Sequence, residues 1–280
     1  MEDIRAKLKS EHPLPPLPAV AQRLLELINQ DAPFEDIATV LATDPAMAAR
    51  VLRVANSAAL RGASPISSLT EAFLRLGTMQ LRQLILGLVF VHHFPRRGAF
   101  DYVAFWRHSL HVALAAQQLE YNALGLKLVG TEVYTAGLLH DIGIAYLNLT
   151  ATTRYKEVIV EARASEEPLA AVERRLLGVD HHEAAAYLLG EWRFPPSIVA
   201  VCQHHSAPDK ARENLRDLVR LVNVADRLVW GQGIDNGAKR VGADFDPLVA
   251  LPEIRVDPGR YEAILAEIKA KAEQVETSLT

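Results

Sequence analysis

Apolar residues recur at the spacing of an α-helix along almost the whole chain, and this periodicity limits the folds that the chain can adopt. Near the N-terminus, Val20, Leu24, Leu25 and Ile28 fall on one helical face. Similar stripes follow as far as a last predicted helix, from Tyr261 to about Val275. No stretch shows a convincing alternation of apolar and polar residues, which a half-buried strand requires. The pattern predicts an all-α protein.

The composition agrees with a helical protein that has a well-filled interior. Of the 280 residues, 50% are hydrophobic but only 6% are aromatic. The net charge of −4 argues against broad nucleic-acid binding, which needs clustered Lys and Arg. The longest apolar run, Leu84 to Val91, is too short to span a membrane, and the N-terminus lacks the apolar core of a signal peptide. We therefore expect a cytoplasmic protein that binds neither membranes nor nucleic acids.

The single cysteine, Cys202, excludes an internal disulfide and indicates a reducing compartment. It lies in an apolar run, so we expect a buried, unreactive thiol.

Local signals mark where several helices begin and end. Asp44 and Pro45 are typical of an N-cap followed by a first helical residue. Ser67 or Ser68 is the predicted N-cap of a later helix, and Gly77 separates that helix from a longer one. These signals predict a series of short helices in the first hundred residues.

The segment Phe94 to Gly98 interrupts the helical periodicity and raises the local charge. We expect it to separate an N-terminal helical subdomain, residues 1–97, from a helical bundle, residues 98–232, that packs against it. Residues 233–280 are expected to form a C-terminal loop and helix, to which the sequence assigns no further role.

Histidine and aspartate residues gather in the second half in a pattern that suits a metal site. His140 and Asp141 form a doublet in a helix predicted from about Thr131 to Leu147. Further candidates follow at His181, His204, His205 and Asp226. Neighbouring side chains on a helix point about 100° apart, so the doublet can serve two metals or hold one with a bridging carboxylate. Imidazole and carboxylate ligands suit Fe, Mn or Zn, so we predict one or two divalent ions, the alternative being a hydrogen-bonded network without metal.

Several motifs resemble, in order, the signature of the HDOD domain. They are Leu14-Pro15-Pro16-Leu17-Pro18, Asp44-Pro45, Val54-Ala55-Asn56-Ser57 and Arg75-Leu76-Gly77. The second half resembles the HD-superfamily core of such domains, and the resemblance extends roughly from Pro13 to Val229. It implies a bacterial signal-transduction module, usually without established catalytic activity. The nearest enzymatic relatives are the HD-GYP phosphodiesterases, which hydrolyse cyclic di-GMP at a site with two or three metals.

The resemblance also implies a full set of metal ligands. The HD-GYP pattern falls on His108, His140, Asp141, His181, His204, His205 and Asp226. In this pattern Asp141 is the natural bridging ligand. We prefer His181 to the adjacent His182 because it shares an inward apolar stripe, and His111 is a less favoured neighbour of His108.

Two elements of the HD-GYP pattern are absent. Ile144 stands where a lysine commonly follows the His-Asp-Ile-Gly motif, and Ser206-Ala207-Pro208 stands in place of Gly-Tyr-Pro. The substrate-phosphate contacts of those elements therefore cannot be carried over to this chain.

These features predict a signalling module that acts through protein–protein contacts and carries a metal site in its second half. The expected partner is a signalling protein of unknown identity, a nucleotide is a candidate ligand, and the helical surfaces also allow a homodimer. The alternative is a metal-dependent phosphohydrolase that acts on a nucleotide or on cyclic di-GMP. In that case Asp141 would serve catalysis, and bound metal would lower the pKa of water.

Overall fold

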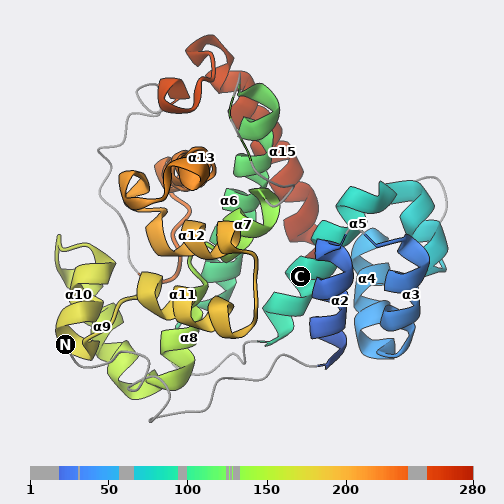
Figure 1. Ribbon diagram of the computed structural model, residues 1–280, viewed down its shortest axis with the longest axis horizontal. Helices are drawn as coiled ribbons and strands as arrows, with labels where there is room; N and C mark the ends of the chain where they lie inside the picture. Colours follow the sequence, from blue (N-terminus) through green and yellow to red (C-terminus); the bar gives the residue numbers. More distant parts are fainter. Residues whose placement is uncertain are drawn as a thin grey trace. The chain divides into compact units, whose positions relative to one another are not determined.

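The computed structural model describes residues 19–30, 32–56, 66–93, 100–123, 126, 128, 133–238 and 251–279. Regular structure in these residues is helical throughout, without a strand, which confirms the predicted all-α fold (Figure 1). The chain divides into two compact units, one of residues 15–93 and 269–280 and the other of residues 1–14 and 94–268. The motif from Leu14 to Pro18 and the break from Phe94 to Gly98 lie outside the described residues. None of the described helices is long and apolar enough to cross a membrane.

The smaller unit is built from the helices at the start of the chain. They are α2 (Ala19–Asn29), α3 (Phe34–Ala42), α4 (Pro45–Ala55) and α5 (Leu69–His93). Helix α3 packs on α2, and α4 packs along α5. The core between them includes the fully buried Leu24, Leu41 and Val51, while Phe34 and Phe73 stack with ring centroids 4.2 Å apart.

The predicted boundaries in this unit are confirmed by their hydrogen bonds. Asp44 Oδ1 accepts a hydrogen bond from the N–H of Met47 at 3.0 Å and so caps α4. Ser68 accepts one from the N–H of Glu71 at 3.1 Å and caps α5. Gly77 interrupts α5 with a φ of +78°, a left-handed conformation that glycine adopts without strain.

The larger unit holds the remaining described α-helices. They are α6 (Tyr102–Asn122), α7 (Val133–Leu139), α8 (Ile142–Thr150), α9 (Thr152–Ala164), α10 (Leu169–Leu177), α11 (His181–Glu191), α12 (Pro196–His204), α13 (Glu213–Gly231) and the part of α15 (Tyr261–Leu279) that extends to Ile268. Helix α6 is buried on most sides and packs against α7 and α13. Helix α12 contacts α7, α11 and α13, and α11 also packs on α8. The helices that carry the candidate ligands therefore surround one interior.

Two glycines let helices of the larger unit approach very closely. A Cβ added to Gly137 in α7 would lie 2.8 Å from the Cα of Ala113 in α6. A Cβ added to Gly143 in α8 would lie only 1.9 Å from the carbonyl oxygen of His181 in α11. The second approach brings the start of α8 against the start of α11, and with it the His140-Asp141 doublet toward His181.

Candidate metal centre

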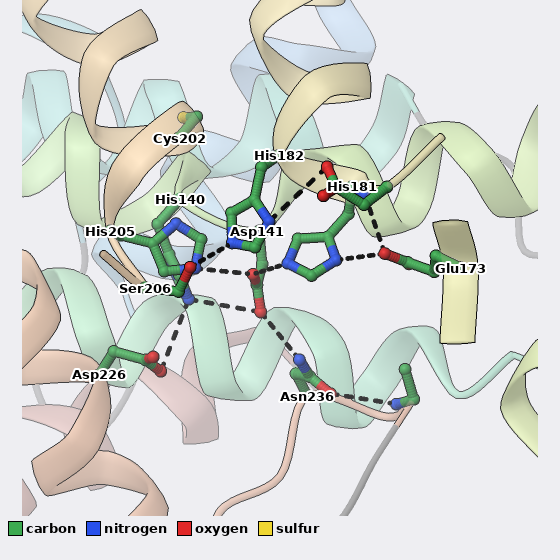
Figure 2. A network of polar contacts seen from close by, with 12 residues as sticks. His140, Asp141, Glu173, His181, His182, Cys202, His205, Ser206, Asp226 and Asn236 are labelled. Atoms are coloured by element: carbon green, nitrogen blue, oxygen red, sulfur yellow. Dashed lines mark hydrogen bonds and ion pairs between the residues drawn. The ribbon is translucent and has the colours of Figure 1, made fainter. Parts of the chain in front are cut away.

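His140 and Asp141 lie in a turn between α7 and α8, so the prediction of one continuous helix through the doublet is wrong. The reason is local. Nδ1 of His140 donates a hydrogen bond to the carbonyl of Gly137 at 2.8 Å, an acceptor that a continuing helix would offer to the N–H of Asp141. Asp141 then adopts φ −103° and ψ 12° at the start of α8. The turn brings both side chains of the doublet into the buried interior (Figure 2).

Three imidazoles of the site are oriented by hydrogen-bond acceptors that face their Nδ1 atoms. Nδ1 of His108 lies 2.9 Å from the carbonyl oxygen of Ile234, and Nδ1 of His140 faces Gly137 as described. Nδ1 of His181 lies 2.5 Å from a carboxylate oxygen of Glu173. A carbonyl or a carboxylate accepts but does not donate, so each Nδ1 carries the hydrogen. In the neutral ring, Nε2 then presents a lone pair on the opposite side, as a metal ligand does.

The Nε2 atoms of His140, His181 and His205 converge on the carboxylate of Asp141 (Figure 2). Its Oδ2 lies 3.4 Å from Nε2 of His140. Its Oδ1 lies 3.4 Å from Nε2 of His205 and 3.7 Å from Nε2 of His181. One carboxylate therefore faces imidazoles on both of its oxygens, which is the arrangement of a bridging ligand.

Asp226 supplies a second carboxylate from α13. Its Oδ1 lies 3.0 Å from Nε2 of His108 and 3.6 Å from Nε2 of His140. Among the described residues, three overlapping groups have ligand atoms within 4.8 Å of one another: His108, His140 and Asp141; His140, His205 and Asp226; and His181, His182 and His205. We call their union the metal centre.

The polar groups of the metal centre would not satisfy one another if every imidazole were neutral. With neutral imidazoles, lone pairs on Nε2 would face lone pairs on carboxylate oxygens across distances of 3.0–3.7 Å. Nε2 of His140 and Nδ1 of His205 are buried and make no hydrogen bond within the described part of the chain. Buried polar atoms of this kind normally have partners. A divalent cation or bound protons would supply the missing positive charge, so this donor set fits a metal.

The pKa shifts of these residues show that the carboxylates favour positive charge in the interior. Burial opposes charge on His140, but Asp141 and Asp226 outweigh it and raise the pKa of His140 well above its usual value. Burial is likewise outweighed at His181, where Glu173 and Asp141 raise the pKa to about 9. Against the effect of burial, His140 and His205 hold the pKa of Asp141 well below its usual value. The ionised carboxylates thus hold positive charge in the interior.

His182 joins the metal centre beside His181, although the sequence favoured His181 alone. Asp180 caps α11 by accepting a hydrogen bond from the N–H of Glu183 at 2.9 Å, and this places both histidines in the first turn. Nε2 of His182 lies 2.9 Å from the hydroxyl of Ser206. Burial and the neighbouring His181 lower the pKa of His182 to about 3, so its ring is neutral at pH 7.

His204 is the predicted ligand that the structure does not bring to the metal centre. It belongs to none of the three ligand groups, whereas the adjacent His205 belongs to two. His205 is buried, with 3% of its surface exposed, but His204 is only partly buried. Consecutive residues near a helix end point about 100° apart, and here only His205 is turned into the interior that holds the other ligand groups. His111 is buried but also lies outside the three groups.

Glu173 and Asn236 contact the metal centre and were not predicted from the sequence. Glu173 is fully buried in α10, where it accepts hydrogen bonds from Nδ1 of His181 and, at 2.5 Å, from the hydroxyl of Tyr155. A sequence signal for Glu173 exists, since it lies four residues from both Leu169 and Leu177 and so interrupts an apolar stripe. Asn236 follows α13 in a loop and carries no comparable signal.

Residues 232–238, which we call the strap, return from α13 to the metal centre. The amide of Asn236 donates to Oδ2 of Asp141 at 2.8 Å, and the carbonyl of Ile234 holds His108. Arg163 in α9 donates to the carbonyl oxygens of Gly237 at 2.7 Å and Ala238 at 3.3 Å. The strap therefore orients the imidazole of His108 and the carboxylate of Asp141.

Cys202 is a free, buried cysteine as expected, and it lies apart from the polar contacts of the metal centre (Figure 2). Its thiol donates to the carbonyl of Leu139 at 3.2 Å. Burial raises the pKa of the thiol, which keeps it protonated and unreactive.

The chain belongs to the HDOD family, because residues 14–208 match the HDOD domain. The match ends before α13, which supplies Asp226, and before the strap. An uncharacterized protein of Treponema pallidum (strain Nichols) is 25% identical over 222 residues. That alignment covers 76% of this chain but only 42% of the relative, so the chain spans less than half the relative's length.

Solved structures share the fold over almost the whole chain. A structure from Shewanella amazonensis SB2B named "Putative phosphohydrolase" has a TM-score of 0.78 and 26% identity, and the match covers 98% of this chain and 97% of the other. An HDOD domain protein with unknown function from Geobacter sulfurreducens has a TM-score of 0.79 and 24% identity, covering 98% and 99%.

Proposed function

We propose that the protein is an HDOD signalling module that acts through protein contacts and carries a divalent-metal centre in its larger unit. The observation that carries this proposal is the position of Asp141. Both of its carboxylate oxygens face imidazole nitrogens, at 3.4 Å from His140 and 3.4 Å from His205. A bridging carboxylate between two histidine-lined subsites accounts for this geometry.

The residues would divide between two subsites. His108, His140 and Asp226 would hold one ion, and His181, His205 and, through its neutral ring, His182 would hold the other. Imidazole and carboxylate donors together suit Fe, Mn or Zn. Glu173 behind His181 and Asn236 beside Asp141 supply the outer hydrogen bonds that such ligands require.

Membership of the HDOD family supports a signalling role, and so do the two departures from the HD-GYP pattern. Ile144, at the position of the HD-GYP lysine, is fully buried in the core and offers no cation to a substrate. Ser206, where the Gly-Tyr-Pro motif would begin, hydrogen-bonds to His182 instead. A regulatory or stabilising metal is consistent with both features.

A metal-dependent phosphohydrolase is the second candidate, because two adjacent subsites joined by one carboxylate are also the arrangement that phosphoester hydrolysis uses. The name of the Shewanella structure points to the same activity class. Bound divalent ions would supply Lewis acidity and a lowered water pKa. Asp141 would hold the subsites together, while Glu173 would keep the proton of His181 on Nδ1.

Elemental analysis of the purified protein tests the metal centre directly. We expect stoichiometric Fe, Mn or Zn in the native protein and its loss in Asp141→Ala, while Asp36→Ala, which removes an exposed carboxylate in the smaller unit, retains it. Native protein without bound metal, and unable to take up Mn²⁺ or Zn²⁺, would refute the proposal.

A panel of phosphodiesters and phosphomonoesters with added Mn²⁺ or Fe²⁺ then separates the two candidates. The signalling module without catalysis predicts no turnover above the background. The hydrolase predicts metal-stimulated turnover that disappears in Asp141→Ala. Turnover that survives this substitution would count against a role for the metal centre in hydrolysis.

A further inference from the structure

A hollow of about 700 Å³ lies beside the metal centre in the larger unit. Its wall includes Ser206 and Asp209 after α12, Arg220, Asn223 and Arg227 on α13, and Glu253. The volume falls in the range of about 300–1,000 Å³ that small-molecule sites occupy. Its lining combines donor groups with two carboxylates, so polar contacts rather than apolar burial would hold an occupant.

Two hydrogen bonds connect this hollow to the metal centre. Ser206 lies on the wall, and its hydroxyl is 2.9 Å from Nε2 of His182. Asn223 also lines the hollow, and its amide donates to the backbone carbonyl of His205 at 2.7 Å. A molecule that contacts Ser206 and Asn223 in the hollow would therefore be connected to His182 and His205 through one side chain each.

Helix α13 lines the hollow with one face and contributes a residue to the metal centre from another. Arg220, Asn223 and Arg227 are three and four residues apart and so lie on one face, which borders the hollow. Asp226 precedes Arg227 by one residue and contacts His108 in the metal centre. The two arginines are seven positions apart in the sequence, about 10 Å along the helix axis. The hollow thus offers two guanidinium groups along one wall, with the metal centre behind it.

Both arginines are paired with carboxylates that can be exchanged. Arg220 lies 2.8 Å from Oδ1 of Asp209, whose side chain is 86% exposed. Arg227 lies 3.9 Å from Glu253, with side chains 39% and 46% exposed. Exposed ion pairs contribute little to stability. An anionic ligand with several oxygens can therefore replace these carboxylates at small cost.

We propose that the hollow binds a phosphate-bearing small molecule of nucleotide size, held by Arg220 and Arg227 and contacted by Ser206 and Asn223. The planar guanidinium group donates two parallel hydrogen bonds to phosphate, which is why arginine suits this chemistry. The inference rests on the proposed function in placing the ligand beside a metal centre. It goes further by naming the place where a phosphate-bearing ligand binds and the residues that hold it.

Equilibrium binding to the full-length protein as purified tests the proposal, with inorganic phosphate, AMP and adenosine as three separate probes. We expect the phosphate-bearing probes to bind and Arg220→Ala and Arg227→Ala to weaken them about tenfold each, since each loses a charge-assisted contact. Arg212→Ala is the matched control, because it removes an exposed arginine that does not line the hollow. AMP binding more tightly than phosphate assigns a nucleotide, equal binding assigns a bare phosphate group, and both support the site.

The variant Asp209→Asn provides a second test. If Arg220 had only a structural role, this substitution would leave the affinity for AMP and phosphate unchanged. It removes the competing carboxylate, so AMP and phosphate should bind more tightly to this variant than to the native protein. Unchanged affinities in both arginine variants, tighter binding of adenosine than of AMP, or no binding of either phosphate probe would overturn the proposal.

Metal content measured on the same samples keeps the two proposals distinguishable. Protein that neither contains metal nor takes up Mn²⁺ or Zn²⁺, but shows arginine-dependent phosphate binding, would refute the metal centre and retain this site. Protein with full metal content whose phosphate binding ignores Arg220 and Arg227 would do the reverse.

Discussion

The carboxylate of Glu173 holds His181 at two points. One oxygen lies 2.5 Å from Nδ1 of the ring and 2.8 Å from the backbone N–H of the same residue. The other accepts from the hydroxyl of Tyr155 at 2.5 Å. A fully buried acid on α10 therefore sets the ring direction at the start of α11.

Glu173→Gln should weaken metal binding by about 10- to 100-fold, the usual effect of losing an outer-shell partner. The amide keeps the shape of the side chain but loses the negative charge that makes His181 a strong metal ligand. Competition with a chromophoric chelator measures the affinity, and Glu166→Gln, an exposed position before α10, is the control. Equal affinities in the two variants would show that Glu173 has only a packing role.

The two adjacent histidines at the end of α12 should behave differently. His205→Ala should lose bound metal because it removes a nitrogen 3.4 Å from the bridging carboxylate of Asp141. His204→Ala should retain it, since His204 is in none of the ligand groups. Elemental analysis of the metal content of both variants tests this difference. Loss of metal in the His204 variant would restore the assignment implied by the HD-GYP pattern.

Metal binding should release protons, and its affinity should increase with pH up to about pH 9. Glu173 and Asp141 raise the pKa of His181 to about 9 despite burial, and the pKa of His140 is also raised. A raised pKa means that these rings are protonated at pH 7 without metal, and a metal must displace those protons. Calorimetric titration with Zn²⁺ in buffers of different ionisation enthalpy measures the release. An affinity that does not change between pH 6 and pH 9 would contradict it.

Gly143→Ala should destabilise the protein by about 1–3 kcal/mol or more, the usual range for overpacking. The added Cβ would lie 1.9 Å from the carbonyl of His181, so α8 and α11 must separate. Gly190→Ala is the matched control, because a Cβ at Gly190 in α11 meets nothing within 4 Å. In that helix the control should stabilise by about 0.5–1 kcal/mol. Chemical denaturation measures both, and equal effects would contradict the close packing of α8 on α11.

Asn236→Ala should reduce metal affinity without a large loss of helix content. The variant removes the hydrogen bond to Oδ2 of Asp141, while Arg163 still holds the strap through backbone carbonyls. Co²⁺-substituted protein gives a visible spectrum that reports the geometry around the ion. A changed spectrum identifies Asn236 as a positioning residue for Asp141, whereas an unchanged spectrum and affinity would leave it a structural residue of the strap.

Much of the fold followed from local sequence. The all-α class, the caps at Asp44 and Ser68 and the break at Gly77 depend on side chains and backbone preferences within a few residues. The helix through His140 and Asp141 was predicted wrongly, because apolar periodicity continues across the doublet. The interruption comes from the hydrogen bond of His140 to Gly137 and the close packing of Gly143 on His181.

The sequence by itself determined that the chain is helical, that it has an HDOD signature and that enough imidazoles and carboxylates are present for a metal centre. Only the tertiary structure decided which of them meet: His205 rather than His204, His182 as well as His181, and Glu173 and Asn236 behind them. The physical reason is that helical propensity and apolar periodicity act over a few residues. The direction of a side chain in a shared interior, in contrast, depends on how helices far apart in the sequence pack against one another.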